Sequence, residues 1–279
     1  MAIQRAASND LDKRPNNTMK TIDKALFLLG FFSLDTPEYR LSDLARAANV
    51  DKATAMRILG SLSIGGLIEQ HPETKKYRLG TAVLHLARLR EASFPVVSVI
   101  QPILDALTLE VGESTHACLF AGSAMTTIAI AEPQRPTRVY INPAEALPLH
   151  ATASGLAYLA HVPEAMQKNL IKRIDFKTHA KGTVRNKAEL MDKLEETRLN
   201  GLAVSWRSFE DEVTGIAAPI FDWHGKVQAT LSATCISNRL TDKALLGTKV
   251  AVLKASQKAT QAMGGASPVQ THVATREQR

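Results

Sequence analysis

Apolar residues recur every three or four positions in two short segments near the start of the chain, residues 41–48 and 53–64. This spacing is typical of amphipathic helices that bury one face. Asn49 lies between the segments, where a left-handed turn residue is tolerated. Asp51 stands where a helix N-cap belongs, and Gly65 and Gly66 follow the second segment. The pattern predicts two helices joined by a tight turn.

Two strand-like segments follow, residues 67–70 and 76–79, with a turn signal at Pro72. Two helices and a β-hairpin in this order predict a winged helix-turn-helix, whose second helix enters the DNA major groove. Arg57 is the leading base or phosphate contact, and the basic wing residues would bind phosphates. A solvated charged hairpin is the alternative for the wing. The predicted DNA contacts are Lys52, Ala53, Thr54, Met56, Arg57, Lys75, Lys76 and Arg78.

Helical periodicity begins near Thr18, where Ile22, Leu26 and Leu28 belong to one apolar stripe. We expect this helix to complete a three-helix core with the two helices above. A basic helical segment then continues beyond the wing, until Pro95 breaks it. The predicted organisation is a disordered tail at 1–17, a winged helix-turn-helix at 18–80, a linker helix at 81–94, a second domain at 95–263 and a loose tail at 264–279.

The second domain alternates between strand and helix patterns. Helices are predicted at 96–111, from Ser154, Pro163 and Lys187, and at 241–263; strands are predicted at 115–120, 125–132, 137–141, 201–206, 215–222 and 226–236. Strands grouped in hairpins with helices between them predict an α+β domain with an antiparallel sheet. The segment 223–226, WHGK, predicts a turn that pairs the last two strands.

Length and charge are consistent with a two-domain DNA-binding protein. The chain has 279 residues, 45% of them hydrophobic, and a net charge of +7. Residues 1–94 hold 14 Lys and Arg against 10 Asp and Glu, a net of +4, so the basic excess is denser in the first third. No apolar run suits a membrane span or a signal peptide, so we expect a cytoplasmic protein with no membrane partner.

The two cysteines predict neither a disulfide nor a metal site. Cys118 and Cys235 each lie in an apolar strand-like run, without a CxxC motif or a zinc-like histidine spacing. His116, Cys118 and His150 are too scattered along the sequence to argue for a metal. We expect reduced thiols, no metal and no cofactor.

Four separated motifs carry a family likeness: DKATAMRIL at 51–59, KKYRLG at 75–80, LPLHATASGLAYLA at 147–160 and GIAAPIFDWHGKVQATLS at 215–232. Over residues 19–263 the chain resembles the IclR family of bacterial transcriptional regulators. The resemblance implies a winged helix-turn-helix followed by a GAF-like α/β effector-binding domain. It also implies that a small organic acid or aromatic metabolite changes how a homodimer or homotetramer engages double-stranded operator DNA.

The resemblance also directs attention to candidate effector-binding residues. Thr152 and Ser154 precede or begin a predicted helix, so their hydroxyls and the free backbone N–H groups there could hold a carboxylate. Alternation places Ser232 and Thr234 on one strand face, and both match positions that line the family's ligand pocket. A solvated sheet face is the alternative for these polar residues. The predicted effector site comprises His150, Thr152, Ala153, Ser154, Gly155, Arg207, Ser208, Ser232 and Thr234.

Two of these residues carry specific hypotheses. Relatives often have a carboxylate near Ser208, and its replacement beside Arg207 predicts a cationic clamp for an anionic effector. His150 either donates to the ligand or fixes the loop through a hydrogen bond to backbone.

Three functional classes compete at this point. A ligand-responsive transcription factor is favoured, and we expect no enzyme activity. A DNA-tethered enzyme lacks support because the sequence has no GxSxG elbow, HExxH, phosphate-binding loop or dinucleotide fingerprint. An architectural DNA-binding protein would use the second domain only as a dimer scaffold.

Overall fold

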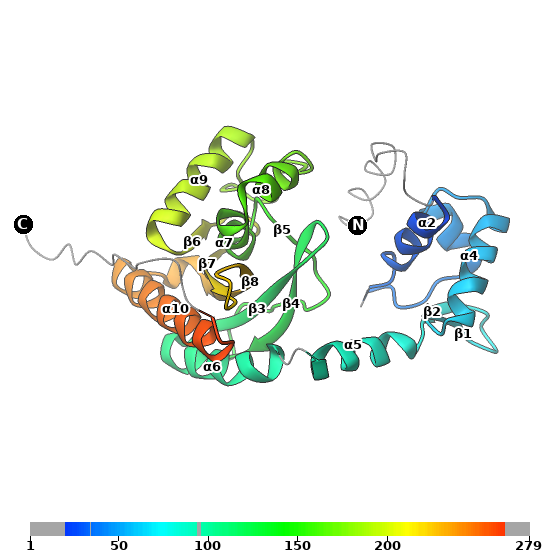
Figure 1. Ribbon diagram of the computed structural model, residues 1–279, viewed down its shortest axis with the longest axis horizontal. Coiled ribbons are helices and arrows are strands. Elements are labelled where there is room, and N and C mark those ends of the chain that lie inside the picture. Colours follow the sequence, from blue (N-terminus) through cyan, green and yellow to red (C-terminus); the bar gives the residue numbers. More distant parts are fainter. Residues whose placement is uncertain (1–19, 34, 94–95, 266–279) are drawn as a thin grey trace, which may run out of the picture. The chain divides into compact units, whose positions relative to one another are not determined.

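The computed structural model describes residues 20–33, 35–93 and 96–265. It divides into two compact units, Met1–Pro95 and Val96–Arg279, whose helices and strands are labelled in Figure 1. The tail predicted at 1–17 lies outside the described residues, as does the C-terminal tail beyond Gly265. No helix of the described residues combines the length and apolar character that crossing a membrane requires.

The described part of the first unit contains three helices, a two-stranded antiparallel sheet and a further helix. They are α2 (Lys20–Leu29), α3 (Leu41–Ala47), α4 (Lys52–Ile64), β1 (Ile68–Gln70), β2 (Tyr77–Leu79) and α5 (Ala82–Ser93). Side chains from all three leading helices and from β1 form one apolar core, which includes Leu28, Leu44, Ile58, Leu59 and Ile68. The predicted winged helix-turn-helix is confirmed.

The turn between α3 and α4 follows the prediction in detail. Asn49 has a φ of 51°, in the left-handed region. Asp51 caps α4, because its carboxylate accepts a 2.8 Å hydrogen bond from the Thr54 backbone N–H. The stripe predicted on α2 is partly wrong, since Leu28 is buried but Ile22 and Leu26 are 52% and 62% exposed. The core contact of α2 is therefore restricted to the side that carries Leu28.

The second unit is built on a six-stranded antiparallel sheet in the order β5-β4-β3-β8-β7-β6. Its strands are β3 (Ser114–Ala121), β4 (Ala124–Ala131), β5 (Leu147–Pro148), β6 (Ala203–Trp206), β7 (Val213–Phe221) and β8 (Val227–Ile236). The predicted turn between β7 and β8 is confirmed, because the Asp222 N–H donates to the Lys226 carbonyl over 2.9 Å and Gly225 has a φ of 71°.

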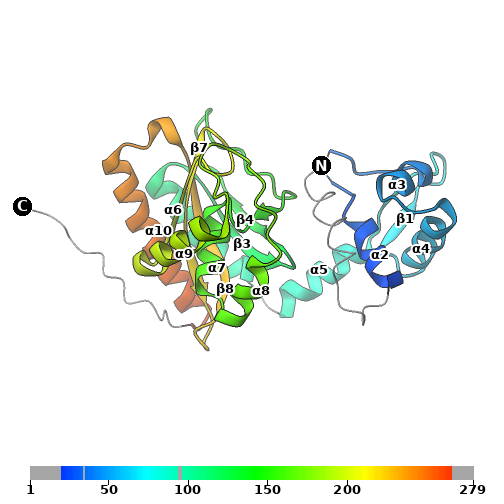
Figure 2. The same cartoon turned by 90° about the horizontal axis from the view of Figure 1, so that it is seen from above.

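Helices cover both faces of this sheet (Figure 2). On one face, α6 (Val96–Val111) and α10 (Asp242–Ala262) pack against alanine, leucine and isoleucine side chains of β3, β4, β7 and β8. On the other, α7 (Ala153–His161) packs on β7 and β8 with α8 (Glu164–Ile171) and α9 (Lys187–Asn200) outside it. The 3-10 turn η1 (Ser237–Arg239) links β8 to α10. Two separate apolar cores result, one on each side of the sheet.

The strand predicted at 137–141 is wrong. This segment belongs to the irregular connection between β4 and β5, and the short strand β5 pairs with β4 instead. Side chains satisfy its backbone: Ser114 Oγ donates to the Val139 carbonyl over 2.7 Å, and an Arg239 N–H donates to the Thr137 carbonyl over 3.1 Å. The connection therefore lies against the end of the sheet without extending it.

Candidate functional site

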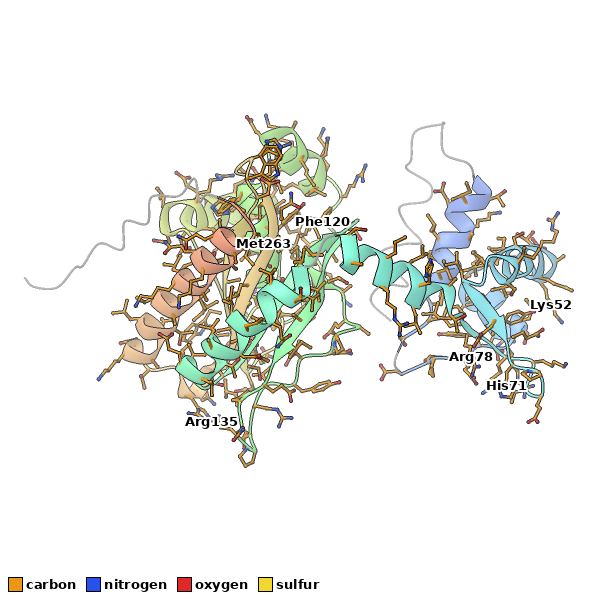
Figure 3. All side chains as sticks on the ribbon, turned by 60° about the horizontal axis from the view of Figure 1, so that its bottom comes forward. Lys52, His71, Arg78, Phe120, Arg135 and Met263 are labelled. Carbon is orange, nitrogen blue, oxygen red and sulfur yellow. The ribbon has the colours of Figure 1, made fainter. Side chains whose placement is uncertain are left out.

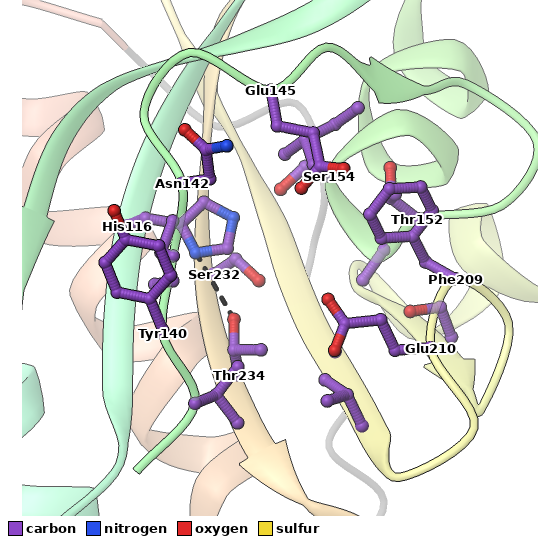
Figure 4. Close-up of a pocket in the computed structure, with 17 residues that line it drawn as sticks. His116, Tyr140, Asn142, Glu145, Thr152, Ser154, Phe209, Glu210, Ser232 and Thr234 are labelled. Carbon is purple, nitrogen blue, oxygen red and sulfur yellow. Dashed lines mark hydrogen bonds between the residues drawn. The ribbon is translucent and has the colours of Figure 1, made fainter. Parts of the chain in front are cut away.

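A pocket of about 590 Å³, its open mouth included, lies in the second unit beside the start of α7 (Figure 4). The 139–147 connection, the start of α7, the 205–213 segment and strands β3, β7 and β8 contribute its walls. The lining residues are His116, Val139, Tyr140, Ile141, Asn142, Glu145, Leu147, Thr152, Ala153, Ser154, Ser205, Phe209, Glu210, Val213, Gly215, Ser232 and Thr234. Five predicted effector residues are therefore brought together: Thr152, Ala153, Ser154, Ser232 and Thr234.

Strand register places the polar floor of the pocket. Ser205 pairs with Gly215, which pairs with Thr234, so these three residues form one row across β6, β7 and β8. His116 pairs with Ser232, which lies two residues before Thr234 on the same face of β8. Ser232 and Thr234 are 2% and 8% exposed, so the alternative of a solvated sheet face is wrong for them. They form a buried polar surface on the side of the sheet that faces the start of α7.

The start of α7 reaches the pocket because two glycines permit close approach. A Cβ on Gly155 would stand 2.5 Å from the Leu149 Cα, and one on Gly215 would stand 3.1 Å from the Ala153 Cβ. Thr152 caps the helix by accepting a hydrogen bond from the Gly155 N–H over 3.1 Å. The N–H groups of a first helical turn have no acceptor within the helix and attract anions.

Ser154 is the polar residue of this helix start that keeps hydrogen-bonding capacity. It is 2% exposed, and its hydroxyl has no hydrogen-bond partner among the described residues. The neighbouring Cys118 thiol, whose pKa burial raises to about 12, is a weak partner at most. By contrast, the Thr152 hydroxyl already donates to the Pro148 carbonyl over 2.9 Å. A buried hydroxyl without a partner is costly, so Ser154 is suited to bind a ligand oxygen.

His116 is an uncharged hydrogen-bonding group in the pocket floor. Its Nδ1 lies 3.3 Å from the Thr234 hydroxyl, as the dashed line in Figure 4 marks. Complete burial lowers the pKa of His116 from 6.5 to about 4, because the protonated ring would lose its hydration. The ring is therefore neutral near pH 7 and can form a hydrogen bond without attracting an anion by charge.

The fixed charges of the pocket are negative. Glu145 and Glu210 line it, and no lysine or arginine stands among the described lining residues. The pKa of Glu145 is raised, first by desolvation and then by repulsion from Glu210. The predicted cationic clamp is thus absent from the described lining.

Four predicted effector residues lie outside the pocket lining and have structural contacts instead. An Arg207 guanidinium nitrogen donates to Asn238 Oδ1, in η1, over 2.6 Å, and Arg207 is not among the lining residues. The Ser208 hydroxyl donates to the Gly182 carbonyl over 2.7 Å. His150 Nε2 lies 3.1 Å from the Lys177 carbonyl, which matches the loop-fixing alternative, and burial lowers the pKa of His150. Gly155 is needed for the close packing described above.

Sequence reasoning missed several lining residues: His116, Tyr140, Asn142, Glu145, Phe209 and Glu210. An Asx turn was the one available signal, because Asn142 Oδ1 accepts from the Ala144 N–H over 3.0 Å in the sequence Asn-Pro-Ala-Glu. The others come from irregular segments or from register between strands distant in sequence.

The candidate DNA-binding residues of α4 form an exposed surface on the first unit. Lys52, Ala53, Met56 and Arg57 are exposed, whereas Thr54 is half-buried and lies 3.4 Å from an Arg57 guanidinium nitrogen. The buried face of the same helix carries Ala55, Ile58 and Leu59. The helix therefore uses its apolar stripe for the core and leaves the opposite face accessible.

The wing residues differ in how far their charges are neutralised. Arg78 lies 2.7 Å from the Glu69 carboxylate, and Lys76 lies 3.9 Å from the Glu38 carboxylate. Lys75 is exposed at the hairpin turn with a φ of 55°. Figure 3 labels Lys52 and Arg78 on this unit. Lys75 is thus the wing cation best placed for a phosphate.

Cysteine and metal chemistry find no support in the described residues. Cys118 and Cys235 are buried, and burial raises the pKa of each thiol to about 12. No group of three or more His, Cys, Asp or Glu side chains among the described residues is arranged to hold a metal ion.

Family models match both parts of the chain. A model of the IclR helix-turn-helix domain matches residues 21–72, and a model of the C-terminal domain of the bacterial transcriptional regulator IclR matches residues 91–261. The HTH-type transcriptional regulator XynR of Escherichia coli (strain K12) is 26% identical over 88% of this chain and 98% of its own length.

Solved structures agree in fold. A candidate IclR transcriptional regulator from a Silicibacter species is 34% identical, with a TM-score of 0.82 over 89% of this chain and 98% of that one. An IclR homologue from Microbacterium hydrocarbonoxydans, crystallised with 4-hydroxybenzoate, is 22% identical, with a TM-score of 0.73 over 88% of this chain and 99% of that one. With a helix-turn-helix unit and an antiparallel-sheet domain matched along most of its length, the chain belongs to the IclR family of bacterial transcriptional regulators.

Proposed function

We propose that this protein is a transcriptional regulator whose operator binding is modulated by a small organic carboxylate held in the pocket of the second unit. The unpartnered, buried hydroxyl of Ser154 carries the proposal, because it lies at the start of α7, where free N–H groups favour an anion. Ser232, Thr234 and neutral His116 supply further hydrogen bonds to the body of the ligand. The Microbacterium homologue's small aromatic carboxylate supports this ligand class.

We propose α4 as the recognition helix and the β1–β2 hairpin as the wing. Lys52, Thr54 and Arg57 would make the polar base and phosphate contacts, with Ala53 and Met56 as the apolar part of the same face. Lys75 would bind a phosphate directly. Lys76 and Arg78 would first have to release the carboxylates of Glu38 and Glu69, with which they form ion pairs.

We propose a homodimer or homotetramer as the working species. Leu84, Leu86 and Leu89 of α5 are 61%, 54% and 55% exposed, which is an unusual concentration of apolar surface on one helix. A second copy of the chain would cover such a surface, and two-fold symmetry would match a palindromic operator.

Selection from a random DNA library, followed by fluorescence anisotropy, tests the regulator function. Binding of the selected DNA should change when a pocket-binding carboxylate is added. Full ligand occupancy without any change in DNA affinity would instead favour an architectural protein. Recovery of the carboxylate is followed by NMR in the same samples, since its conversion would favour a DNA-tethered enzyme.

A further inference from the structure

The mouth of the pocket has the composition of a cation-binding site. Glu145 and Glu210 bring two carboxylates to the lining, and Tyr140 and Phe209 bring two aromatic rings, which lie on opposite sides of the pocket in Figure 4. Carboxylates and aromatic faces together are the groups that proteins use to bind ammonium ions. We propose that the effector is an aminocarboxylic acid, whose ammonium group binds Glu145 and Glu210 while its carboxylate binds at Ser154.

The two carboxylates lack compensation within the protein. Neither Glu145 nor Glu210 forms an ion pair with any described residue, whereas Glu113, Glu132 and Glu196 each pair with a nearby cation. Desolvation raises the pKa of Glu145 and repulsion from Glu210 raises it further, so the two carboxylates interact. A bound cation would relieve this repulsion, and an uncharged or purely anionic ligand would not.

The site for the ligand carboxylate rests on a separate observation. Ser154 is 2% exposed, lines the pocket and has no hydrogen-bond partner among the described residues. Its hydroxyl and the first N–H groups of α7 favour an oxyanion. His116 is neutral near pH 7, and Ser232 and Thr234 carry no charge, so the pocket floor favours neither sign. The arrangement is complementary to a zwitterion.

This inference rests on the proposed regulatory function and narrows its ligand class. Calorimetry at pH 7.5 compares acids that share a skeleton but differ in the donor group. The sets are propionate with the pairs alanine and lactate, and 3-aminopropionate and 3-hydroxypropionate; valerate with the pairs norvaline and 2-hydroxyvalerate, and 5-aminovalerate and 5-hydroxyvalerate; and 4-methylbenzoate with 4-aminomethylbenzoate and 4-hydroxymethylbenzoate. At least one amino compound should bind ten times more tightly than its unsubstituted acid and its hydroxy analogue.

Two variants test whether the preference for amino compounds depends on Glu145 and Glu210. The double variant Glu145→Gln/Glu210→Gln should lose this tenfold preference and bind the unsubstituted acid at least as tightly as the wild type does. Glu132→Gln serves as the matched control, because Glu132 pairs with Arg138 and lies outside the pocket lining. It should keep the preference.

The inference is overturned if no amino compound binds ten times more tightly than both its unsubstituted acid and its hydroxy analogue. It is also overturned if the double variant keeps the preference. The proposed function has a separate readout, since acids that bind and change DNA affinity would support it even when amino groups add nothing. Ligands that bind without changing DNA affinity would count against the proposed function. The preference for amino compounds would still be decided by the calorimetry alone.

Discussion

Replacing Ser154 with alanine should have opposite effects on the free protein and on ligand binding. Ser154 is 2% exposed, and its hydroxyl has no nitrogen or oxygen hydrogen-bond partner among the described residues, so the free protein bears most of the cost of its desolvation. That cost is about 1–3 kcal/mol for a buried polar group. We take ~1 kcal/mol as the gain from Ser154→Ala, because the Cys118 thiol lies close enough to recover part of it.

Differential scanning calorimetry measures the effect on the free protein. A gain of ~1 kcal/mol corresponds to a melting temperature about 2–4 °C higher for a domain of this size. Loss of a hydrogen bond to a charged ligand should weaken carboxylate binding roughly tenfold to a hundredfold, by titration calorimetry. Greater stability combined with weaker binding is the expected signature of a residue that is unsatisfied until the ligand arrives.

Ser256→Ala is the matched control. Ser256 is 5% exposed, but its hydroxyl donates to the Pro219 carbonyl over 2.6 Å, on the opposite face of the sheet. Its loss should lower the free energy of unfolding by ~1 kcal/mol and leave ligand affinity unchanged. If Ser154→Ala destabilises the free protein as much as Ser256→Ala does, the Ser154 hydroxyl is already satisfied and the reasoning is refuted.

Three further predictions concern other parts of the molecule. Burial lowers the pKa of His116 to about 4, so its contribution to the stability of the fold is complete above pH 6.5 and is lost as the pH falls toward 4. Calorimetry should find that His116→Gln loses less stability than the wild type between pH 6.5 and pH 4, and equal losses of stability would contradict this prediction. Gly155→Ala should lower the free energy of unfolding by about 1–3 kcal/mol, and with it the melting temperature, because its Cβ would stand 2.5 Å from the Leu149 Cα; an unchanged melting temperature would exclude the close packing. Arg57→Ala should weaken binding of the selected DNA, and Lys75→Ala should reduce the slope of log affinity against log salt concentration by about one unit. Anisotropy curves identical to wild type for both variants would show that this surface does not bind DNA.

Local chemistry explains why the helix-turn-helix could be predicted in detail. The stripe formed by Ala55, Ile58 and Leu59 and the cap at Asp51 depend on residues within one or two helical turns, and both are present. Leu26 was misassigned to the core because periodicity alone does not say how wide a face the neighbouring helices will cover. The segment 137–141 has strand-forming residues, but the edge of β4 pairs with β5 instead.

The pocket residues could be predicted only where a local sequence pattern coincided with a buried face of the sheet. Alternation along β8 placed Ser232 and Thr234 on one face, and the burial of that face came from α7. Glu145 and Glu210 come from irregular segments on either side of the pocket, so no spacing in the sequence connects them. Arg207 was assigned to the ligand by its position next to Ser208, but its guanidinium is held by Asn238.

The central claim is that occupancy of the pocket beside α7 controls DNA binding by α4 and the wing. The most direct test is fluorescence anisotropy of library-selected DNA, with and without a saturating pocket ligand, for the wild type and Ser154→Ala. We expect the ligand to change the wild-type affinity for DNA, and the same ligand concentration to have a much smaller effect on Ser154→Ala, whose affinity without ligand matches the wild type. Equal responses from both proteins, or a wild-type affinity that is indifferent to bound ligand, would contradict the claim.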